Sequence, residues 1–243
     1  MTRNRVVAVL FVLTYGVDSS TAATLLLEQG VNGYTGTGDT TIFQDRPNNS
    51  SGGFPELFSG AILNGSLRRT LIRFDLPTTL TSSAVITSVS LRLVVDRARP
   101  GVQTHTLRKV TRSWNEGNLQ LTDPSTIGQG AASQPGDATW NSAADGQTSW
   151  TTAGGDFSGA TSGSGAVDIA GTISLFTGAG MVQDVQSWLN GSAQNFGWVL
   201  LGNEASVWNA KRFVSSEGIS GQRPQLTITF APPTSAANWQ LFY

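Results

Sequence analysis

Alternating hydrophobicity in two neighbouring stretches constrains this sequence more than any other feature. In residues 68–76, every second position from Ile72 to Leu76 is apolar, and an arginine or an aspartate lies between. Residues 85–95 alternate in the same way. A period of two is that of a β-strand with one face against a core. We therefore predict two long strands, joined by a turn-rich connection, at the centre of an all-β domain.

Beyond these strands the pattern changes twice. From Met181 to Leu189 apolar residues recur at spacings of three and four, and Gly191 offers a stop, so a short helix is predicted near residues 180–190. Residues 118–165 are rich in Gly, Ser and Thr but carry several aromatic residues, which favours long folded loops over a linker. The expected fold is a two-sheet antiparallel β-sandwich of jelly-roll type with this helix and long loops.

The N-terminus follows the order of a signal peptide. Arg3 and Arg5 precede an apolar run at residues 6–13 and then small residues up to Ala23. We predict a signal peptide at residues 1–23, one sandwich domain at 24–233 and a short polar and aromatic tail at 234–243; an ordinary first strand is the alternative for 1–23. No later run reaches the roughly 20 apolar residues of a membrane span, so a secreted or cell-surface protein is expected.

The residues needed for catalysis are not grouped in the sequence. The single histidine, His105, lies on a predicted strand with no Ser, Asp or Cys motif beside it, and no nucleophile elbow, paired-histidine motif or phosphate loop occurs. We predict a non-catalytic protein that requires no cofactor, with polysaccharide lyase or hydrolase activity as the remaining enzyme option. The net charge of −1 and the predicted export weigh against nucleic acid as a partner.

Basic residues are concentrated in one segment. Nine of the 15 lysines and arginines lie between positions 68 and 112, against only two acids. Guanidinium groups that project from one sheet face can bind carboxylates or sulfates bidentately. The predicted basic face consists of Arg69, Arg73, Arg92 and Lys109. Pairing of these side chains with the chain's own acids, such as Asp75 or Glu116, is the alternative.

Seven tryptophans are the second resource for binding. An exposed indole can stack on the apolar face of a sugar ring, whereas a buried one fills a core. Trp114, Trp188 and Trp198 lie in strongly patterned segments and are predicted to be core residues. The tryptophans in loops are the candidates for contact, and among them Trp140 and Trp150 are predicted to stack on a sugar.

Calcium is a weaker candidate ligand. Asp39, Asp156 and Asp168 lie in or near glycine-rich loops and offer the oxygen ligands that a hard cation prefers, although none belongs to an EF-hand loop. We select Asp39 and Asp156 as possible ligands of a structural Ca²⁺. The alternative is that these aspartates stabilise turns.

A set of ordered motifs resembles a known family. The motifs are RTLIRFDL at 69–76, VSLRL at 89–93, WNEG at 114–117, ATWN at 138–141, GGDF at 154–157, VQDVQSWL at 182–189, NFGW at 195–198, SSE at 215–217 and RPQL at 223–226. Together they resemble the DNRLRE, or disaggregatase-related, domain, a group that includes alginate-binding carbohydrate-binding modules. The resemblance implies a secreted jelly-roll sandwich of bacterial or archaeal type, found beside polysaccharide-degrading or surface domains.

The sequence thus predicts a secreted, non-catalytic protein that recognises an extracellular, acidic polysaccharide through its basic face and loop aromatics. The alternative is a structural subunit of a surface layer, matrix or filament that self-associates through strand edges, because an unpaired edge accepts a strand from a neighbouring copy.

Overall fold

The computed structural model describes residues 21–120 and 122–231. Nearly all of the predicted signal peptide and the whole predicted C-terminal tail, residues 234–243, lie outside the described residues. No helix within the described ranges combines the length and the apolar character needed to cross a membrane.

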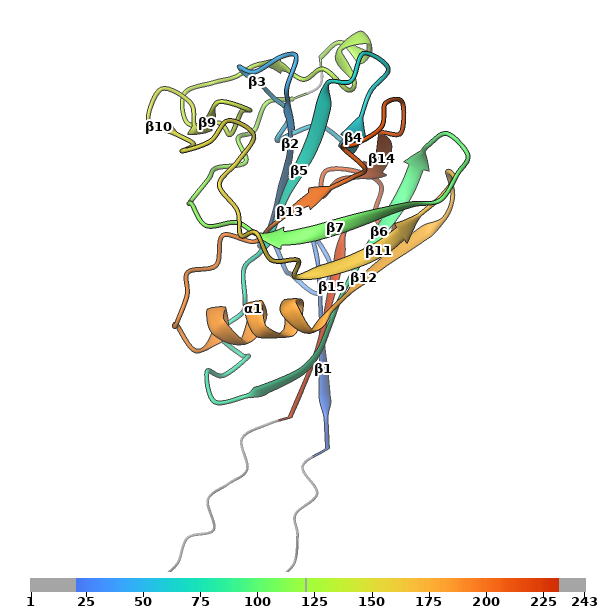
Figure 1. The fold of residues 1–243 in the computed structure, drawn as a ribbon. Coiled ribbons are helices and arrows are strands. Elements are labelled where there is room, and N and C mark those ends of the chain that lie inside the picture. The colour runs from blue at the N-terminus through green and yellow to red at the C-terminus, as the bar shows by residue number, and fades with distance from the viewer. Residues whose placement is uncertain (1–20, 121, 232–243) are drawn as a thin grey trace, which may run out of the picture.

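The main sheet closes into a barrel of eight antiparallel strands (Figure 1). In hydrogen-bonded order the ring consists of β6 (Val85–Arg97), β12 (Ile173–Thr177), β11 (Gly163–Val167), β7 (Gln103–Lys109), β13 (Trp198–Leu201), β5 (Leu67–Phe74), β4 (Glu56–Ala61) and β14 (Lys211–Val214). Strand β14 completes the ring because it pairs with β4 and also with the far end of β6, where Phe213 lies opposite Val95.

The expected two-sheet jelly-roll sandwich is therefore wrong, although the all-β class and the helix are confirmed. A sandwich leaves its two sheets unbonded to each other, whereas here the short strand β14 bridges β4 and β6. The ring closes at a register shift between Arg212 and Phe213. Such irregularities bend a strand and increase its twist, which is what closure of a sheet requires.

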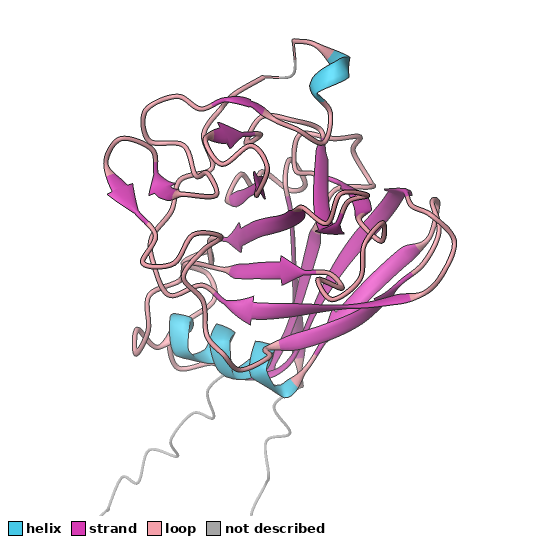
Figure 2. Cartoon of the chain, turned by 45° about the horizontal axis from the view of Figure 1, so that its top comes forward, coloured by secondary structure: helices cyan, strands magenta, loops and turns pink. Residues whose placement is uncertain are grey.

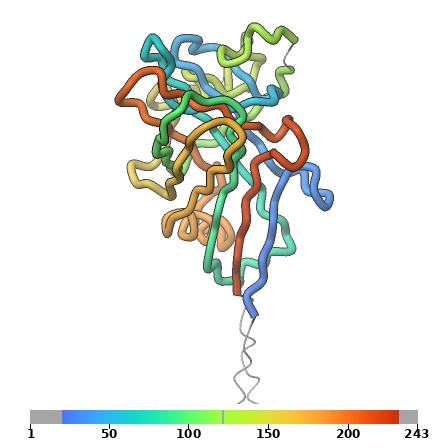
Figure 3. The backbone as a smooth tube through the Cα atoms, turned by 90° about the vertical axis from the view of Figure 1, so that its right-hand side faces the viewer, coloured from blue at the N-terminus to red at the C-terminus, as the bar shows by residue number. Residues whose placement is uncertain are grey.

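Three strands extend the ring. β15 (Gln225–Ala231) pairs with β6, and β1 (Ala23–Glu28) pairs with β15, so these two strands run side by side at one end of the molecule (Figure 3). β2 (Thr37–Phe43) pairs along β5. Short pairs form in the loops: β3 (Asn49–Ser50) with β8 (Ala131–Ala132), and β9 (Ser142–Ala144) with β10 (Thr148–Ser149). A 3-10 turn covers Pro124–Thr126.

The alternating apolar residues of β5 and β6 fill the barrel. Ile72 and Phe74 from β5 join Leu91, Leu93 and Val95 from β6, and all five are buried. Burial of one such side chain stabilises a fold by about 1.5–3 kcal/mol. These residues therefore form the buried faces that their spacing predicted, and their burial stabilises the barrel.

Helix α1 (Ala179–Leu189) lies across one end of the barrel (Figure 2). Its Met181, Val185 and Trp188 are buried in the barrel core, and the ring of Trp188 lies 4.7 Å from that of Trp198. The helix ends at Asn190, directly before Gly191 with its positive φ of 74°. The predicted helix is confirmed, as is the predicted burial of Trp188 and Trp198.

A second core forms outside the ring. Leu71 of β5 and Val199 of β13 face outward and are fully buried, because the loops between β7 and β11 fold over them. Trp114, Trp140 and Trp150 from these loops belong to the same cluster. The apolar outward side chains Leu71 and Val199 therefore lie beneath a covering layer.

Candidate functional site

Arg69 connects β5 to the loops that cover the outer surface of the barrel. Its guanidinium group forms a bidentate pair with Glu204, at 2.7 and 2.8 Å, and donates to the carbonyl of Gly154 at 2.8 Å. The same group lies 4.9 Å from the ring centroid of Trp140 and 5.3 Å from that of Phe157. With its side chain only 14% exposed, Arg69 presents little guanidinium surface to a ligand.

The other residues of the predicted basic face lie apart from one another. Arg73 pairs with Asp75 at 3.2 Å and lies over the ring of Trp114. Lys109 pairs with Asp184 of α1 at 3.1 Å, at the end of the barrel that the helix covers. Arg92 points outward from β6 and forms no ion pair within the described chain; its guanidinium donates to the carbonyl of Gly221 at 3.2 Å.

A single basic face is thus not what the described structure presents. In a closed ring, alternate side chains point to the interior and the exterior, so residues that one flat sheet would place together point in different directions. Three of the four chosen residues are neutralised by acids of the chain, as the alternative interpretation expected. Of the four, only Arg92 has no carboxylate partner within residues 21–120 and 122–231.

The two tryptophans chosen for stacking are core residues. Trp140 is 7% exposed and Trp150 is 5% exposed, and the indole N–H of Trp150 donates to the carbonyl of Thr139 at 2.8 Å. Neither ring presents a face to solvent. Their stacking role is therefore corrected: both fill the space between the loops and the outer surface of β5 and β13.

An exposed aromatic residue lies instead in a groove at the far ends of β4 and β6. Trp208 is 54% exposed and lies in the loop that precedes β14. The groove has a volume of about 630 Å³, and Phe58, Ile62 and Leu63 provide apolar lining. We call it the Trp208 groove.

The loop that carries Trp208 is fixed by hydrogen bonds to the end of β4. The amide of Trp208 donates to the carbonyl of Ile62 at 3.2 Å. Next to it, Oδ1 of the buried Asn209 side chain accepts from the backbone N–H of Ala61 at 3.0 Å, and the backbone N–H of Asn209 donates to the carbonyl of Ala61 at 2.9 Å. These contacts hold Trp208 at a φ of +63°, a conformation that bulky residues rarely adopt.

Arginines from the basic segment border this groove. Arg99 is exposed, and its guanidinium carbon lies 3.4 Å from the ring centroid of Trp208. Buried Lys211 fixes the backbone that carries Arg99, because its ammonium group donates to the carbonyls of Arg99, Gly101 and Asp168 at 2.8–3.0 Å. The arginine and the indole are thereby presented together on a fixed framework.

The lining of the Trp208 groove is positive. It includes Arg97, Arg99 and Arg212 and contains no acidic residue. Arg212 is paired with Asp96 at 2.7 Å, whereas Arg97 and Arg99 form no ion pair with the described chain. Arg97 and Arg99 belong to the basic segment and Trp208 to the loop tryptophans that the sequence indicated, but none of the three is among the residues predicted to bind.

The two aspartates chosen as calcium ligands differ sharply. Asp156 has both carboxylate oxygens occupied: Arg112 and the amide of Thr151 bind Oδ2 at 2.6 and 3.0 Å, and the amide of Thr152 binds Oδ1 at 3.1 Å. Although desolvation acts in the opposite direction, these hydrogen bonds lower the pKa of Asp156. Asp156 therefore stabilises a loop, whereas Asp39 is buried beside two other acids, Glu116 and Glu217.

Comparison of the chain with protein-family models and with curated proteins returned no match. The resemblance of its motifs to the disaggregatase-related domain thus stays a prediction. The function is therefore inferred from the geometry of the side chains.

Proposed function

We propose that this protein binds an acidic polysaccharide, without catalysis, in the Trp208 groove. The observation that carries the proposal is the presence of an exposed, conformationally strained tryptophan beside three arginines in a groove lining without acids. The resemblance to a family that includes alginate-binding modules points to the same class of ligand. On this proposal the protein acts outside the cell, after removal of residues 1–23.

The chemistry of a uronic acid fits this set of groups. Its carboxylate can accept two hydrogen bonds from one guanidinium group, and the C–H face of its ring can pack on an indole. A volume of about 630 Å³ falls within the range of roughly 300–1,000 Å³ that is typical of ligand sites. Because Arg97 and Arg99 are exposed, the attraction should be salt-sensitive over a Debye length of about 8–10 Å.

Affinity electrophoresis tests the proposal. The protein is run in native gels that contain alginate, polygalacturonate or a neutral glucan. We expect retardation in one of the anionic gels, and we expect added salt to reduce it. The Trp208→Ala and Arg99→Ala variants should each weaken binding about fivefold or more, since the loss of one charge-assisted contact or one stacking contact costs about 1–3 kcal/mol.

The matched control is Arg92→Ala. Arg92 is also an arginine without a carboxylate partner in the described chain, but it projects from the outer face of β6 and does not line the groove. The Arg92→Ala variant should be retarded as strongly as the wild type. Absence of retardation in every anionic gel would remove the proposal, and loss of binding in Arg92→Ala with full binding in Trp208→Ala would move the site to another face.

The second candidate is a structural subunit that assembles through strand edges. Closure of the ring leaves few edges, but β1 ends the hydrogen-bonded order and has β15 as its only strand partner among the described residues. Leu26 on β1 is 41% exposed, and a groove of about 660 Å³ lies between β1 and the turn around Tyr34. An added strand would satisfy the free backbone groups of that edge.

Light scattering and negative-stain microscopy separate the two candidates. Assembly predicts concentration-dependent oligomers or filaments, and a proline at Leu26 should reduce them, because proline removes a backbone donor and favours an edge that does not pair. A monodisperse monomer at high concentration argues against assembly and leaves the glycan proposal as the better one.

A further inference from the structure

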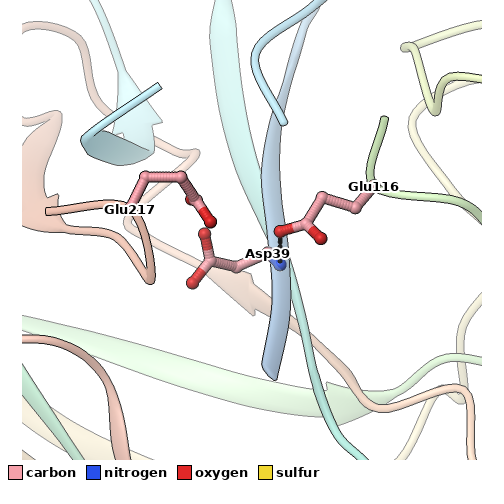
Figure 4. A group of neighbouring side chains, drawn as sticks. All are labelled: Asp39, Glu116 and Glu217. Atoms are coloured by element: carbon pink, nitrogen blue, oxygen red, sulfur yellow. Dashed lines mark hydrogen bonds between the residues drawn. The ribbon is translucent and has the colours of Figure 1, made fainter. Parts of the chain in front are cut away.

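Three carboxylates from distant parts of the sequence meet near the surface (Figure 4). Asp39 lies on β2, Glu116 in the loop after β7, and Glu217 in the loop after β14. One carboxylate oxygen from each lies within 4.8 Å of the others. Asp39 is 1% exposed, Glu116 is partly buried and Glu217 is exposed, so the cluster opens to solvent on the Glu217 side.

The backbone holds the three side chains in place. Glu116 accepts a hydrogen bond from the amide of Asp39 at 2.6 Å, and Oδ2 of Asp39 accepts from the amide of Ser216 at 2.9 Å. The hydroxyl of Ser216 donates to Glu217 at 2.7 Å. The loop of Glu116 also approaches the turn after β3 so closely that a Cβ on Gly52 would lie 2.0 Å from the carbonyl oxygen of Glu116.

One oxygen in this cluster has no partner. Oδ1 of Asp39 is buried and accepts no hydrogen bond in the described structure. A buried polar atom without a partner costs about 1–3 kcal/mol in general and calls for an explanation, such as an ion. Figure 4 shows the carboxyl groups of Asp39 and Glu217 facing each other while Glu116 approaches from the other side of β2.

Among the described residues the cluster has no ion-pair partner, although Arg73 near Glu116 and Arg223 near Glu217 offset part of its negative charge. In the described part of the chain, no lysine or arginine nitrogen lies within 4.0 Å of any of the three carboxylates. Burial, followed by the neighbouring negative charges, raises the pKa of Asp39. Burial also raises the pKa of Glu116, to about 8. Ionised carboxylates in this arrangement repel one another unless a positive charge lies between them.

We propose that Asp39, Glu116 and Glu217 bind a Ca²⁺ ion. The donor set consists only of oxygens, which suits a hard cation and excludes the thiolate and imidazole ligands of zinc sites. One oxygen of each carboxylate lies within 4.8 Å of the other two. Even at that upper limit the point equidistant from all three is about 2.8 Å away, so shifts of a few tenths of an ångström would bring them to the Ca²⁺–O distance of about 2.3–2.6 Å. Water from the open Glu217 side completes the coordination.

The site would join three segments that the sequence separates widely. β2, the Trp114–Gly117 loop and the loop after β14 are each connected to the ion by one side chain. Binding to the folded state alone would stabilise the fold by mass action. The ion is thus expected to have a structural role, independent of the Trp208 groove.

The test uses purified, EDTA-treated and dialysed protein and CaCl₂ as the probe. Isothermal titration calorimetry should show one saturable site, and the melting temperature should rise with CaCl₂ concentration. MgCl₂ should bind more weakly, since Mg²⁺ requires shorter distances and keeps its water ligands. Glu217→Gln should weaken Ca²⁺ binding at least tenfold; because this side chain is exposed, the variant is expected to fold even if Asp39→Asn does not.

Asp156→Asn is the matched control, because it removes an aspartate whose oxygens are already occupied. It should lower stability but keep the full affinity for Ca²⁺. Absence of binding heat and of any melting shift at millimolar CaCl₂ would overturn the proposal, as would unchanged affinity in Glu217→Gln. Equal affinity for Mg²⁺ would overturn the assignment to calcium.

Discussion

His105, the only histidine of the chain, makes the barrel interior sensitive to acid. Its ring is 0% exposed and meets the ring of Phe213 edge-on at 5.9 Å. Nε2 lies 3.4 Å from the carbonyl oxygen of Ser59, and Nδ1 has no partner in the described structure. Burial, with a smaller contribution from the positive charge of Lys211, lowers the pKa of His105 to about 4.

Because the pKa of His105 is lower in the folded chain than in the unfolded chain, the protein loses stability as the pH falls. The unfolded chain takes up the proton near pH 6.5, whereas the folded chain resists it until about pH 4. The stability that neutral His105 contributes is therefore fully present above pH 6.5 and is lost as the pH falls toward 4. Linkage gives a loss of about 2 kcal/mol between pH 7 and pH 5, and about 3 kcal/mol once both states are protonated.

Urea unfolding at pH 7 and pH 5 measures this loss in the wild type and in His105→Leu. The variant should lose about 2 kcal/mol less than the wild type over this interval, because leucine cannot take up a proton. Phe213→Leu is the control: it trims the ring that packs on His105, so it should lower stability at both values and keep the wild-type pH dependence. Equal pH dependence in the wild type and His105→Leu, or an imidazole NMR titration near pH 6.5, would refute the reasoning.

Three substitutions, one of them a control, test which contacts stabilise the fold. Asp184→Asn removes a buried carboxylate that pairs with Lys109 at 3.1 Å and accepts hydrogen bonds from the hydroxyl of Ser162 and the indole N–H of Trp198. Because these buried donors lose a charged acceptor, the free energy of unfolding should fall by about 2–4 kcal/mol in urea titrations; a loss below about 0.5 kcal/mol would contradict this. Gly197→Ala should cost more than about 3 kcal/mol, since φ is +70° and a Cβ would lie 2.1 Å from the carbonyl oxygen of Ile72. Gly191→Ala, with φ of +74° and open space, should cost only about 1 kcal/mol, and equal losses in the two glycine variants would refute the steric argument.

Local periodicity predicted the parts of the fold that depend on nearby residues. The alternation in residues 68–76 and 85–95 corresponds to β5 and β6, and the spacing from Met181 to Leu189 corresponds to α1. Each of these segments buries a face that its own sequence defines. Such elements can be predicted because the same short stretch carries both the pattern and the surface that it buries.

Closure of the barrel could not be predicted in this way. It depends on β14, a strand of four residues whose partners Glu56–Ser59 and Val95–Arg97 lie more than 100 residues earlier. Nothing in the local sequence of Lys211–Val214 indicates that it will pair on both sides. A sandwich and a closed ring therefore share the same alternation, and only non-local pairing distinguishes them.

The binding surface predicted from the sequence around Arg69 and Trp140 does not form, for a related reason. Arg69 and Trp140 satisfy every local criterion for a binding surface, since one is a charged strand residue and the other an aromatic loop residue. The loops fold back onto β5, so the two side chains meet each other, with the guanidinium 4.9 Å from the indole centroid. Where a long loop packs depends on the complementarity of distant surfaces, which residue type and spacing do not encode.

Trp208 is the reverse case, a loop tryptophan that its exposure and its backbone conformation set apart from Trp140 and Trp150. A positive φ costs a bulky residue about 1–3 kcal/mol, and glycine or asparagine would relieve that cost. Burial of the Trp208 ring offsets little of this conformational cost, since the residue remains 54% exposed. Its contact with Arg99 contributes roughly 0.5–1 kcal/mol at an exposed site. Stability alone therefore does not account for a tryptophan at this position, and an indole fixed by Asn209 beside two unpaired arginines is better explained by contact with a ligand.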